Sequence, residues 1–281
     1  MITVPNTPRA RAAGFLAALR TAEGPIPAER VAVIVAHPDD ETIGIGGQLP
    51  RMQGVTIVHV TTGAPANMMD GRAHGFLTSS AYAARRRAEL RAAMACASVP
   101  ENALYCLGLT DQEAFLYLPE IARRLAAFLA GRTIEVVITH PYEGGHPDHD
   151  ATAFGVHAAS ALLSGSGRSA PGLVEMAFYH AGPAGLQTQC FLPAPDYPEL
   201  ALELDEHAWQ CKQRMIAAHE TQRRTLAQFT SRIERFRTAG EYDFAALPND
   251  GLLYYEKFDW GATGPLWQVK AVTALAELGL T

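Results

Sequence analysis

Apolar residues fall into two patterns along the chain, and these patterns predict two kinds of element. Val31 to Ala36 is an unbroken apolar run, and such runs are typical of strands that are buried on both faces, as in a parallel sheet. Tyr82 to Cys96 instead places arginines and a glutamate among alanines over a helix-like length. We therefore expect buried strands and amphipathic helices to follow one another along the chain.

The alternation of these patterns predicts the order of the elements. We expect strands at residues 31–36, 55–61, 103–107, 134–139, 173–179 and 252–258. We expect helices at residues 8–22, 82–96, 119–131, 151–163 and 205–229, a helix-like segment at 42–52, and loops at 62–80 and 140–150. The expected fold class is α/β, a doubly wound, mostly parallel sheet with helices on both faces. We expect a single domain over residues 1–281, because no later segment is large enough for its own core.

Histidine and aspartate gather in two short motifs. The first is Ala36-His37-Pro38-Asp39-Asp40-Glu41, and the second is His146-Pro147-Asp148-His149-Asp150. Each motif follows the carboxyl end of a predicted strand, which is where ligands bind in open sheets of this class. The two motifs are therefore expected to border one site.

The chemistry of the two motifs predicts a metal site. Imidazole and carboxylate together suit a divalent transition metal, and a catalytic zinc usually takes three protein ligands and leaves a position for water. His37 and Asp40 are three residues apart on a tight loop, so both can turn to one point, whereas Asp39 would face differently. A carboxylate beside zinc can accept a proton at neutral pH, because zinc lowers the pKa of water to about 7. The structural alternative is a turn in which Asp39 or Asp40 caps the following helix.

Composition and charge exclude several classes of function. The 23 basic and 29 acidic residues give a net charge of −6, so the chain lacks the positive field that is typical of nucleic-acid binding. No stretch reaches the roughly 18 apolar residues of a membrane helix, and Met1 to Pro5 does not resemble a secretory signal. The four cysteines lack C-x-x-C spacing and are expected to be reduced. We therefore expect a cytoplasmic protein with neither nucleic-acid nor membrane partners.

The first motif, together with the His-Pro-Asp-His of residues 146–149, resembles the PIG-L/LmbE family of zinc-dependent N-acetylglucosaminyl deacetylases, which includes the mycothiol and bacillithiol deacetylases. The resemblance extends from about Val31 through the late helix and implies a Rossmann-like fold. It implies that His37, Asp40 and His149 are the metal ligands and that the cofactor is Zn2+. Two histidines and one carboxylate also suit Fe2+, so the metal stays open.

The resemblance also implies catalytic roles for the other residues of the motifs. Asp39 would be the general base that deprotonates the metal-bound water. His146, as a cationic imidazolium, would stabilise the tetrahedral oxyanion, and Asp148 would orient His146 through a hydrogen bond. Either Asp39 or His146 could protonate the leaving amine.

Outside the motifs, the resemblance implies two contacts to substrate. Arg86 would reach sugar hydroxyls, and so would Asp111 in the Leu-Gly…Asp turn of residues 107–111. The alternatives are a solvated basic helix face for Arg86 and an ordinary turn residue for Asp111. His219 is similar to a histidine of the family, and we expect it to pack in the core.

The sequence therefore predicts a zinc hydrolase that removes an acetyl or other acyl group from the amide nitrogen of an N-acetylglucosamine-type conjugate. The expected partner is this small molecule, and the oligomeric state stays open, with a homo-oligomer among the alternatives. One alternative function is an amidase of a different amide, such as a thiol conjugate or a glycopeptide. Another is a non-catalytic sugar-binding relative, which would not need Asp39 or His146.

Overall fold

A seven-stranded sheet forms the centre of the computed structural model, which describes residues 7–22 and 24–281. Its strands are β2 (Val31–Val35), β4 (Thr56–Pro65), β5 (Leu104–Asp111), β6 (Val136–Thr139), β7 (Gly172–Met176), β10 (Leu200–Glu203) and β11 (Ile233–Thr238). The strand order is β10-β11-β7-β6-β2-β4-β5. The five strands from β7 to β5 pair in parallel, and β11 and β10 add two antiparallel pairings at one edge. The α/β class predicted from the sequence is confirmed.

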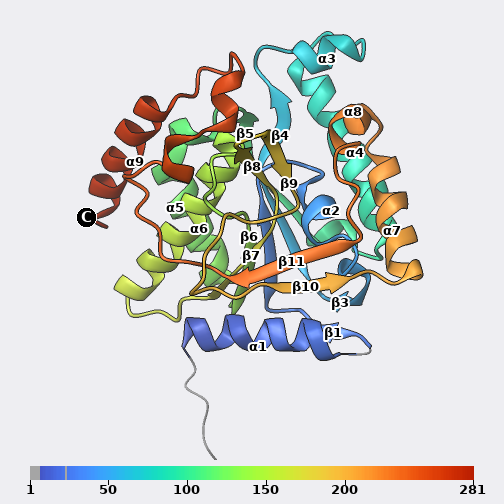
Figure 1. Ribbon diagram of the computed structural model, residues 1–281, viewed down its shortest axis with the longest axis horizontal. Coiled ribbons are helices and arrows are strands. Elements are labelled where there is room, and N and C mark those ends of the chain that lie inside the picture. Colours follow the sequence, from blue (N-terminus) through green and yellow to red (C-terminus); the bar gives the residue numbers. More distant parts are fainter. Residues whose placement is uncertain (1–6, 23) are drawn as a thin grey trace, which may run out of the picture.

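Helices cover both faces of this sheet (Figure 1). One face carries α1 (Pro8–Thr21), α4 (Ser79–Cys96) and α7 (Glu206–Ala218), and the other carries α5 (Leu118–Gly131), α6 (Pro147–Gly165) and α9 (Gly264–Leu278). Side chains of β2 alternate between the two cores, so that Val33 packs with the first set of helices and Ile34 with the second. Because both faces of the strand are covered, every residue of β2 is buried and apolar.

Shorter elements complete the fold. They are the helices α2 (Asp40–Ile45), α3 (Met69–Ala73) and α8 (Arg223–Leu226), and the paired strands β1 (Ile26–Pro27) with β3 (Met52–Gln53) and β8 (Tyr179–Gly182) with β9 (Gly185–Thr188). Single 3-10 turns lie at Leu49–Arg51, Glu101–Ala103, Ala114–Tyr117, Glu220–Gln222, Asn249–Gly251 and Tyr254–Lys257. No helix within the described residues is both long enough and apolar enough to cross a lipid bilayer.

The direction of the chain across the sheet reverses between β2 and β6. From β2 the chain continues through β4 to β5 on one side, whereas β6 is followed by β7 on the other side. The connections after these two neighbouring strands therefore diverge, and such a switch point opens a crevice at the carboxyl ends of the strands. The two histidine motifs follow β2 and β6, so the topology places both of them at this crevice.

The second motif lies on a helix rather than in the predicted loop. Helix α6 begins at Pro147 instead of residue 151, with His146 as its N-cap. Proline is favoured at the first helical position, but a histidine cap is not among the usual cap residues. The loop predicted at 62–80 is also partly structured, because it contains the end of β4 and all of α3.

The carboxyl-terminal third departs most from the sequence-based prediction. The long helix predicted at 205–229 is interrupted at His219, which ends α7 and precedes a 3-10 turn and α8. The strand predicted at 252–258 is wrong, because this segment contains a 3-10 turn at Tyr254–Lys257 and no strand. Strand β11 and helix α9 were not predicted.

Candidate metal centre

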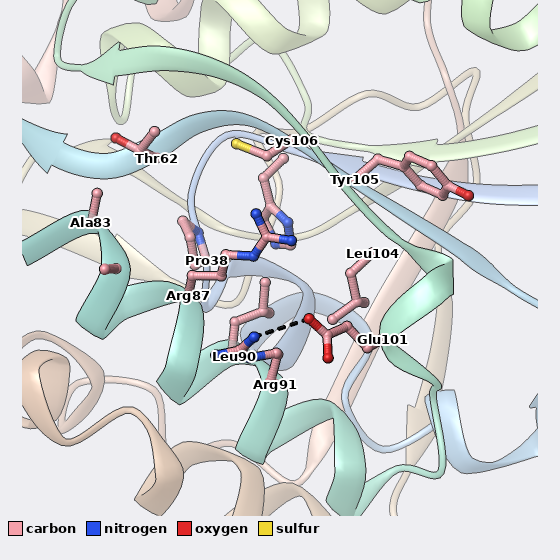
Figure 2. A pocket seen from close by; sticks show the side chains of 12 residues that line it. Pro38, Thr62, Ala83, Arg87, Leu90, Arg91, Glu101, Leu104, Tyr105 and Cys106 are labelled. Atoms are coloured by element: carbon pink, nitrogen blue, oxygen red, sulfur yellow. Dashed lines mark hydrogen bonds and ion pairs between the residues drawn. The ribbon is translucent and has the colours of Figure 1, made fainter. Parts of the chain in front are cut away.

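A cavity of about 320 Å³ lies between α4 and the edge strand β5 (Figure 2). Most of its lining is apolar, and at one side Arg91 donates to Glu101 over 2.9 Å. Of its described lining residues, only Pro38 belongs to either histidine motif. The clustered histidines and aspartates lie instead at the carboxyl ends of β2 and β6, and the candidate chemistry is at that position.

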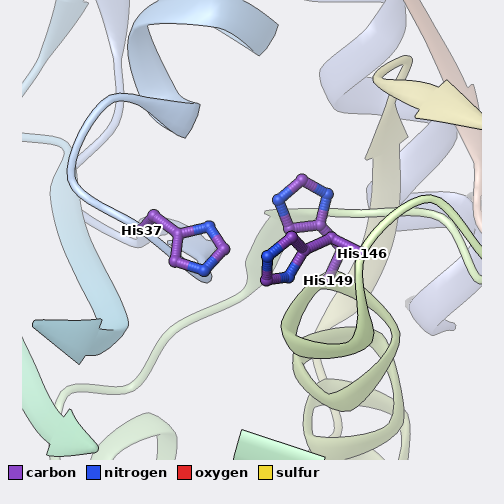
Figure 3. A group of neighbouring side chains, drawn as sticks. All are labelled: His37, His146 and His149. Atoms are coloured by element: carbon purple, nitrogen blue, oxygen red, sulfur yellow. The ribbon is translucent and has the colours of Figure 1, made fainter. Parts of the chain in front are cut away.

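Three histidine rings from the two motifs point toward one another (Figure 3). His37 comes from the connection between β2 and α2, whereas His146 and His149 come from the start of α6. The ring centroid of His37 lies 4.6 Å from that of His146 and 5.3 Å from that of His149. All three side chains are buried. The fold therefore unites two motifs that are separated by about a hundred residues of sequence.

Asp40 joins His37 to His149. Its Oδ2 lies 3.3 Å from His37 Nδ1, and its Oδ1 lies 3.3 Å from His149 Nε2. The same Oδ2 accepts a hydrogen bond of 2.7 Å from the backbone N–H of His37, which fixes the carboxylate. Burial acts to raise the pKa of Asp40, but the neighbouring imidazoles outweigh it and hold that pKa well below its ordinary value. The three residues predicted as ligands are thus in mutual contact around an ionised carboxylate.

The hydrogen bonds of the neighbouring histidines show which lone pairs are available. His140 Nε2 accepts a hydrogen bond of 3.0 Å from the backbone N–H of Ala36, and burial lowers the pKa of His140 to about 3. His146 Nδ1 accepts one of 3.1 Å from the N–H of Asp148. The Nε2 of His149 is buried and has no hydrogen-bond partner within the described part of the chain. Within that part, this nitrogen has only the 3.3 Å contact with Asp40 Oδ1 and is open to a ligand, whereas His140 Nε2 and His146 Nδ1 already accept backbone hydrogen bonds.

The donor set fits a divalent transition metal ion. Donor atoms of His37, His146 and His149 lie within 4.8 Å of one another, and so do those of Asp40, His140 and His149. Buried imidazoles beside a buried carboxylate are the ligands that zinc and iron take in proteins. The unpartnered Nε2 of His149 is the kind of orphaned polar atom that such an ion satisfies.

Asp39 occupies an unusual backbone conformation beside the cluster. Its φ is 136° and its ψ is −24°, and a residue held in such a region costs about 1–3 kcal/mol. It stands at the N-cap position of α2, but its side chain makes no capping hydrogen bond, so the capping alternative fails for this residue. The carboxylate instead pairs with Arg86, whose Nη2 lies 3.0 Å from Asp39 Oδ2. Burial raises the pKa of Asp39 to about 6, against the opposite influence of Arg86.

Asp148 contacts His37 rather than His146 through its carboxylate, which corrects the expected hydrogen bond to His146. One oxygen accepts from the N–H of Gln112 over 2.6 Å and contacts His37 Nε2 at 3.1 Å, and the other accepts from Ala114. The reason is the early start of α6, in which the backbone N–H of Asp148 points back at the His146 cap. The carboxylate is left to face the chain just after β5.

This arrangement determines the state of His146. Because Nδ1 accepts from a backbone N–H, the neutral ring is assigned its proton on Nε2. Burial lowers the pKa of His146 well below its ordinary value, and the nearby His37 and His149 lower it further. This geometry and the lowered pKa favour a neutral His146 with an N–H donor at Nε2, whereas the resemblance implies an imidazolium, and the role of His146 stays a prediction.

Asp111 and Arg86 are both buried at the site. Asp111 is at the end of β5, and its Oδ1 lies 3.1 Å from His37 Nε2 and 4.0 Å from His146 Nε2. The alternative of an ordinary turn residue does not account for these contacts. Arg86 is 4% exposed, so the alternative of a solvated helix face is wrong for it. That either residue contacts substrate stays a prediction.

Sequence reasoning missed several residues that border the cluster. The ring of Tyr179, at the start of β8, lies 5.2 Å from that of His149, and the ring of Trp260 lies 4.7 Å from that of His146. Tyr179 could have been noticed, because it ends a strand predicted at 173–179 and such ends border ligand sites. Trp260 gave no signal, because it follows a segment that we predicted as a strand. His219 is buried, as expected.

Residues 32–160 match the model of a protein family described as PIG-L, GlcNAc-PI de-N-acetylase. The matched region contains both histidine motifs, and the resemblance expected from the motifs is confirmed. No curated protein matches the chain.

Three solved structures illustrate the similarity of the fold. The A40926 pseudoaglycone deacetylase is 19% identical with a TM-score of 0.56, and the match covers 76% of this chain and 99% of that one. A deacetylase of teicoplanin biosynthesis is 16% identical with a TM-score of 0.57, again over 76% and 99%. The N,N'-diacetylchitobiose deacetylase from Pyrococcus horikoshii is 20% identical with a TM-score of 0.50, over 90% of this chain and 80% of that one. At these identities the likeness establishes the fold alone.

Proposed function

We propose that this chain, whose residues 32–160 carry a PIG-L family region, is a metal-dependent hydrolase that removes an acyl group from the nitrogen of an amino sugar. In the simplest case this group is acetyl. The observation that carries the proposal is the buried contact of His37 and His149 with Asp40, next to a further carboxylate at Asp39. A purely structural cluster would not require a buried ring nitrogen, His149 Nε2, to stay without a hydrogen bond among the described residues.

We propose His37, Asp40 and His149 as the residues that hold the ion. The remaining imidazoles are poorer candidates, because His140 Nε2 and His146 Nδ1 already accept backbone hydrogen bonds. When bound, a zinc or iron(II) ion supplies polarisation of the amide carbonyl and acidification of a water molecule. Asp148 orients the His37 ring from the side opposite Asp40, since its Oδ2 lies 3.1 Å from His37 Nε2 while Asp40 contacts Nδ1.

Asp39 is the proposed general base. Its carboxylate is next in sequence to Asp40 and is paired with Arg86, which favours the ionised form that a base requires. It accepts a proton from water as the oxygen of that water forms a bond to the acyl carbon. The acyl C–N bond then breaks, and the products are a carboxylate and the free amine of the sugar.

His146 is the proposed donor to the oxyanion. Its Nε2 carries the ring proton and lies among the three converging imidazoles. A fixed N–H aimed at a developing negative charge stabilises the transition state without a cost of reorganisation. The proton gained by Asp39 passes to the leaving amine, so that the free amine departs in a stable form, while the neutral His146 keeps its Nε2 proton as a hydrogen-bond donor.

The proposed substrate class is a conjugate of the N-acetylglucosamine type. The matching family is described by its action on GlcNAc-PI, and one structural neighbour is a diacetylchitobiose deacetylase. An amino sugar on a larger conjugate, such as a glycopeptide, is the second candidate, because one neighbour is a deacetylase of the A40926 pseudoaglycone and another belongs to teicoplanin biosynthesis. We propose that Asp111 contacts sugar hydroxyls, since it lies at the edge of the histidine cluster.

A screen for amine release tests this proposal. The protein is loaded with zinc or with iron(II) and offered N-acetylglucosamine, diacetylchitobiose, an acylated glycopeptide and simple N-acetyl amides, with Asp39→Asn as the matched control. We expect release from at least one amino-sugar conjugate, well above the simple amides, and little release by the control. Sugar binding without any amine release would favour a non-catalytic relative instead.

A further inference from the structure

We propose that Arg86 is a positioning residue that holds the carboxylate of Asp39 and does not contact the substrate. The inference rests on the proposed function, because it takes Asp39 as the base. It also differs from the sugar contact that the family resemblance implies for Arg86. Three observations support it: the bonds of the guanidinium, the space at Gly63, and a second hold on the backbone of Asp39.

The guanidinium of Arg86 is occupied by protein groups. Its Nη2 donates to the carbonyl of Pro38 over 2.8 Å and to Asp39 Oδ2 over 3.0 Å, and its Nη1 donates to the carbonyl of Gly63 over 2.5 Å. Both hydrogens of Nη2 are therefore used. The Nε makes no hydrogen bond to any described residue but is buried, and the whole residue is 4% exposed. Little of this side chain is available to a sugar hydroxyl.

Gly63 leaves the space that the guanidinium fills. Its φ is +66°, a conformation that favours glycine, and its carbonyl accepts from Arg86. A Cβ at this position would lie 2.7 Å from both Cζ and Nη1 of Arg86. Any side chain at residue 63 would therefore displace the guanidinium, so strand β4 is shaped to receive it.

The backbone of Asp39 is held separately by Glu41. The N–H of Asp39 donates to Glu41 Oε2 over 3.2 Å, and His59 Nε2 contacts the same oxygen at 2.9 Å. Glu41 is fully buried, and its other oxygen accepts from the hydroxyl of Thr42. We call Arg86, Gly63 and Glu41 the Asp39 clamp. The clamp holds both the backbone N–H and the side-chain carboxylate of Asp39, whose backbone conformation is strained. It therefore sets the direction of the carboxylate.

The two roles of Arg86 have different kinetic signatures. A residue that contacts substrate equally in the ground and transition states raises KM when it is removed, whereas a residue that positions the base lowers kcat. In Arg86→Met we expect kcat to fall about 10²-fold or more, with KM within about threefold of the wild type. Metal content per chain should be unchanged. A raised KM with unchanged kcat would overturn the inference.

A matched control lies next to Arg86 on the same helix. Arg87 is exposed, and Arg87→Met removes the same charge without touching the Asp39 clamp. We expect this variant to keep the wild-type kcat and KM. If Arg87→Met lowered kcat as much as Arg86→Met, the effect would be one of overall charge, and the positioning role would be lost.

Gly63→Ala tests the clamp while Arg86 stays in the chain. The added Cβ should push the guanidinium away from Asp39 and produce the same loss of kcat as Arg86→Met. The double variant Arg86→Met/Asp39→Asn should be no slower than Asp39→Asn alone, since both changes remove the same positioned base. Independent, multiplicative losses in the double variant would contradict the positioning role.

A comparison of metal-free crystal structures separates this inference from the proposed function. In Arg86→Met we expect the Asp39 carboxylate to leave its wild-type position, whether or not a substrate is known. A carboxylate that stays in place overturns the inference even if the protein is a deacetylase. A wild-type protein that releases no amine from any substrate overturns the proposed function, while a displaced carboxylate would still support the clamp.

Discussion

The two ends of helix α2 both carry buried charged groups. Among the described residues, only the amino end has charged-group atoms that lack a hydrogen-bond partner. At the amino end, Asp40 contacts three imidazoles and lies next to Asp39. In the part of the chain that the structure describes, the Nε2 of His149 has no hydrogen-bond partner at this end, and Asp111 Oδ1 has a contact with His37 Nε2, which Asp148 also contacts. Buried groups of this kind are uncommon in folded proteins, and each calls for a physical explanation.

The carboxyl end of α2 has a complete set of bonds. Lys212 is fully buried, and its Nζ donates to the carbonyl of Ile43 and to Glu234 Oε1, both over 2.7 Å. The carboxylate of Glu234 also accepts from the backbone N–H of Gly47 over 2.8 Å and from the side-chain amide of Gln48 over 3.2 Å. This ion pair fastens α7 and β11 to the end of the helix.

The difference between these ends shows how a buried charge can be interpreted. A pair whose atoms are all bonded fixes the geometry of the fold, and removing one partner leaves an uncompensated charge. A cluster in which some buried polar atoms lack hydrogen bonds is less stable on its own, and those atoms can bind a further ligand. We therefore expect changes at the amino end to affect metal binding and turnover, and changes at the carboxyl end to affect stability.

His149→Ala should have the largest effect, because it removes the buried ring nitrogen that no described residue hydrogen-bonds. We expect bound metal to fall from one ion per chain to almost none, and turnover to fall about 10⁴-fold or more, since the acidified water is lost. Elemental analysis of the purified protein and a rate assay measure both. A variant that kept one ion per chain would exclude His149 as a ligand.

Asp39→Asn should retain the metal and lose turnover about 10²–10⁴-fold, the contribution of a general base. Asparagine keeps the shape of the side chain, and Arg86 can still donate to its oxygen. The metal content serves as the control, because it separates a missing base from a missing ion. A rate within a few-fold of the wild type would remove Asp39 from the mechanism.

Lys212→Met should destabilise the fold by about 3–5 kcal/mol, because Glu234 would stay buried without its cation. Unfolding in urea measures this loss. Turnover per folded, metal-loaded chain should change little, since Lys212 is bonded at the opposite end of α2 from Asp40. A large loss of kcat in fully folded protein would contradict the division between the two ends.

The double variant Lys212→Met/Glu234→Gln tests the cause of that destabilisation. Without the negative charge, the buried site has no unpaired ion, and the amide oxygen of the new side chain can still accept from the N–H of Gly47. We expect the double variant to recover part of the stability that Lys212→Met loses. A double variant that is less stable than Lys212→Met would show that packing, not charge, dominates this end of the helix.

The amino end of α2 was largely predictable from the sequence, because its signals are local. Five apolar residues of β2 lead directly into His37 and Asp40, and the strand end places both at the edge of the sheet. The start of α6 was less predictable. His146 caps the helix with a ring nitrogen, and cap preferences favour other residue types.

The carboxyl end and the Asp39 clamp were not predictable in the same way. Lys212 and Glu234 come from a helix and a strand that only the fold brings together, and a lysine on an amphipathic helix is ordinarily exposed. Arg86 stands between two other arginines, so the sequence does not indicate which of the three faces β4. That choice depends on tertiary packing, here on the space at Gly63.

The smallest expected effect is the coupling between the two ends. Saturating metal, at about 100 times its Kd, should stabilise the wild type by about 2.7 kcal/mol, and we expect the same increment in Lys212→Met. Changes at separate sites without shared partners usually add within about 0.5 kcal/mol, and the groups that Lys212 bonds, Ile43 and Glu234, are not those that contact Asp40. Unfolding of both proteins in urea, with zinc and with a chelator, measures the two increments. An increment in Lys212→Met smaller by more than about 1 kcal/mol would mean that α2 transmits strain from its carboxyl end to the metal ligands. The ion pair at the carboxyl end would then help to position the ligands at the amino end.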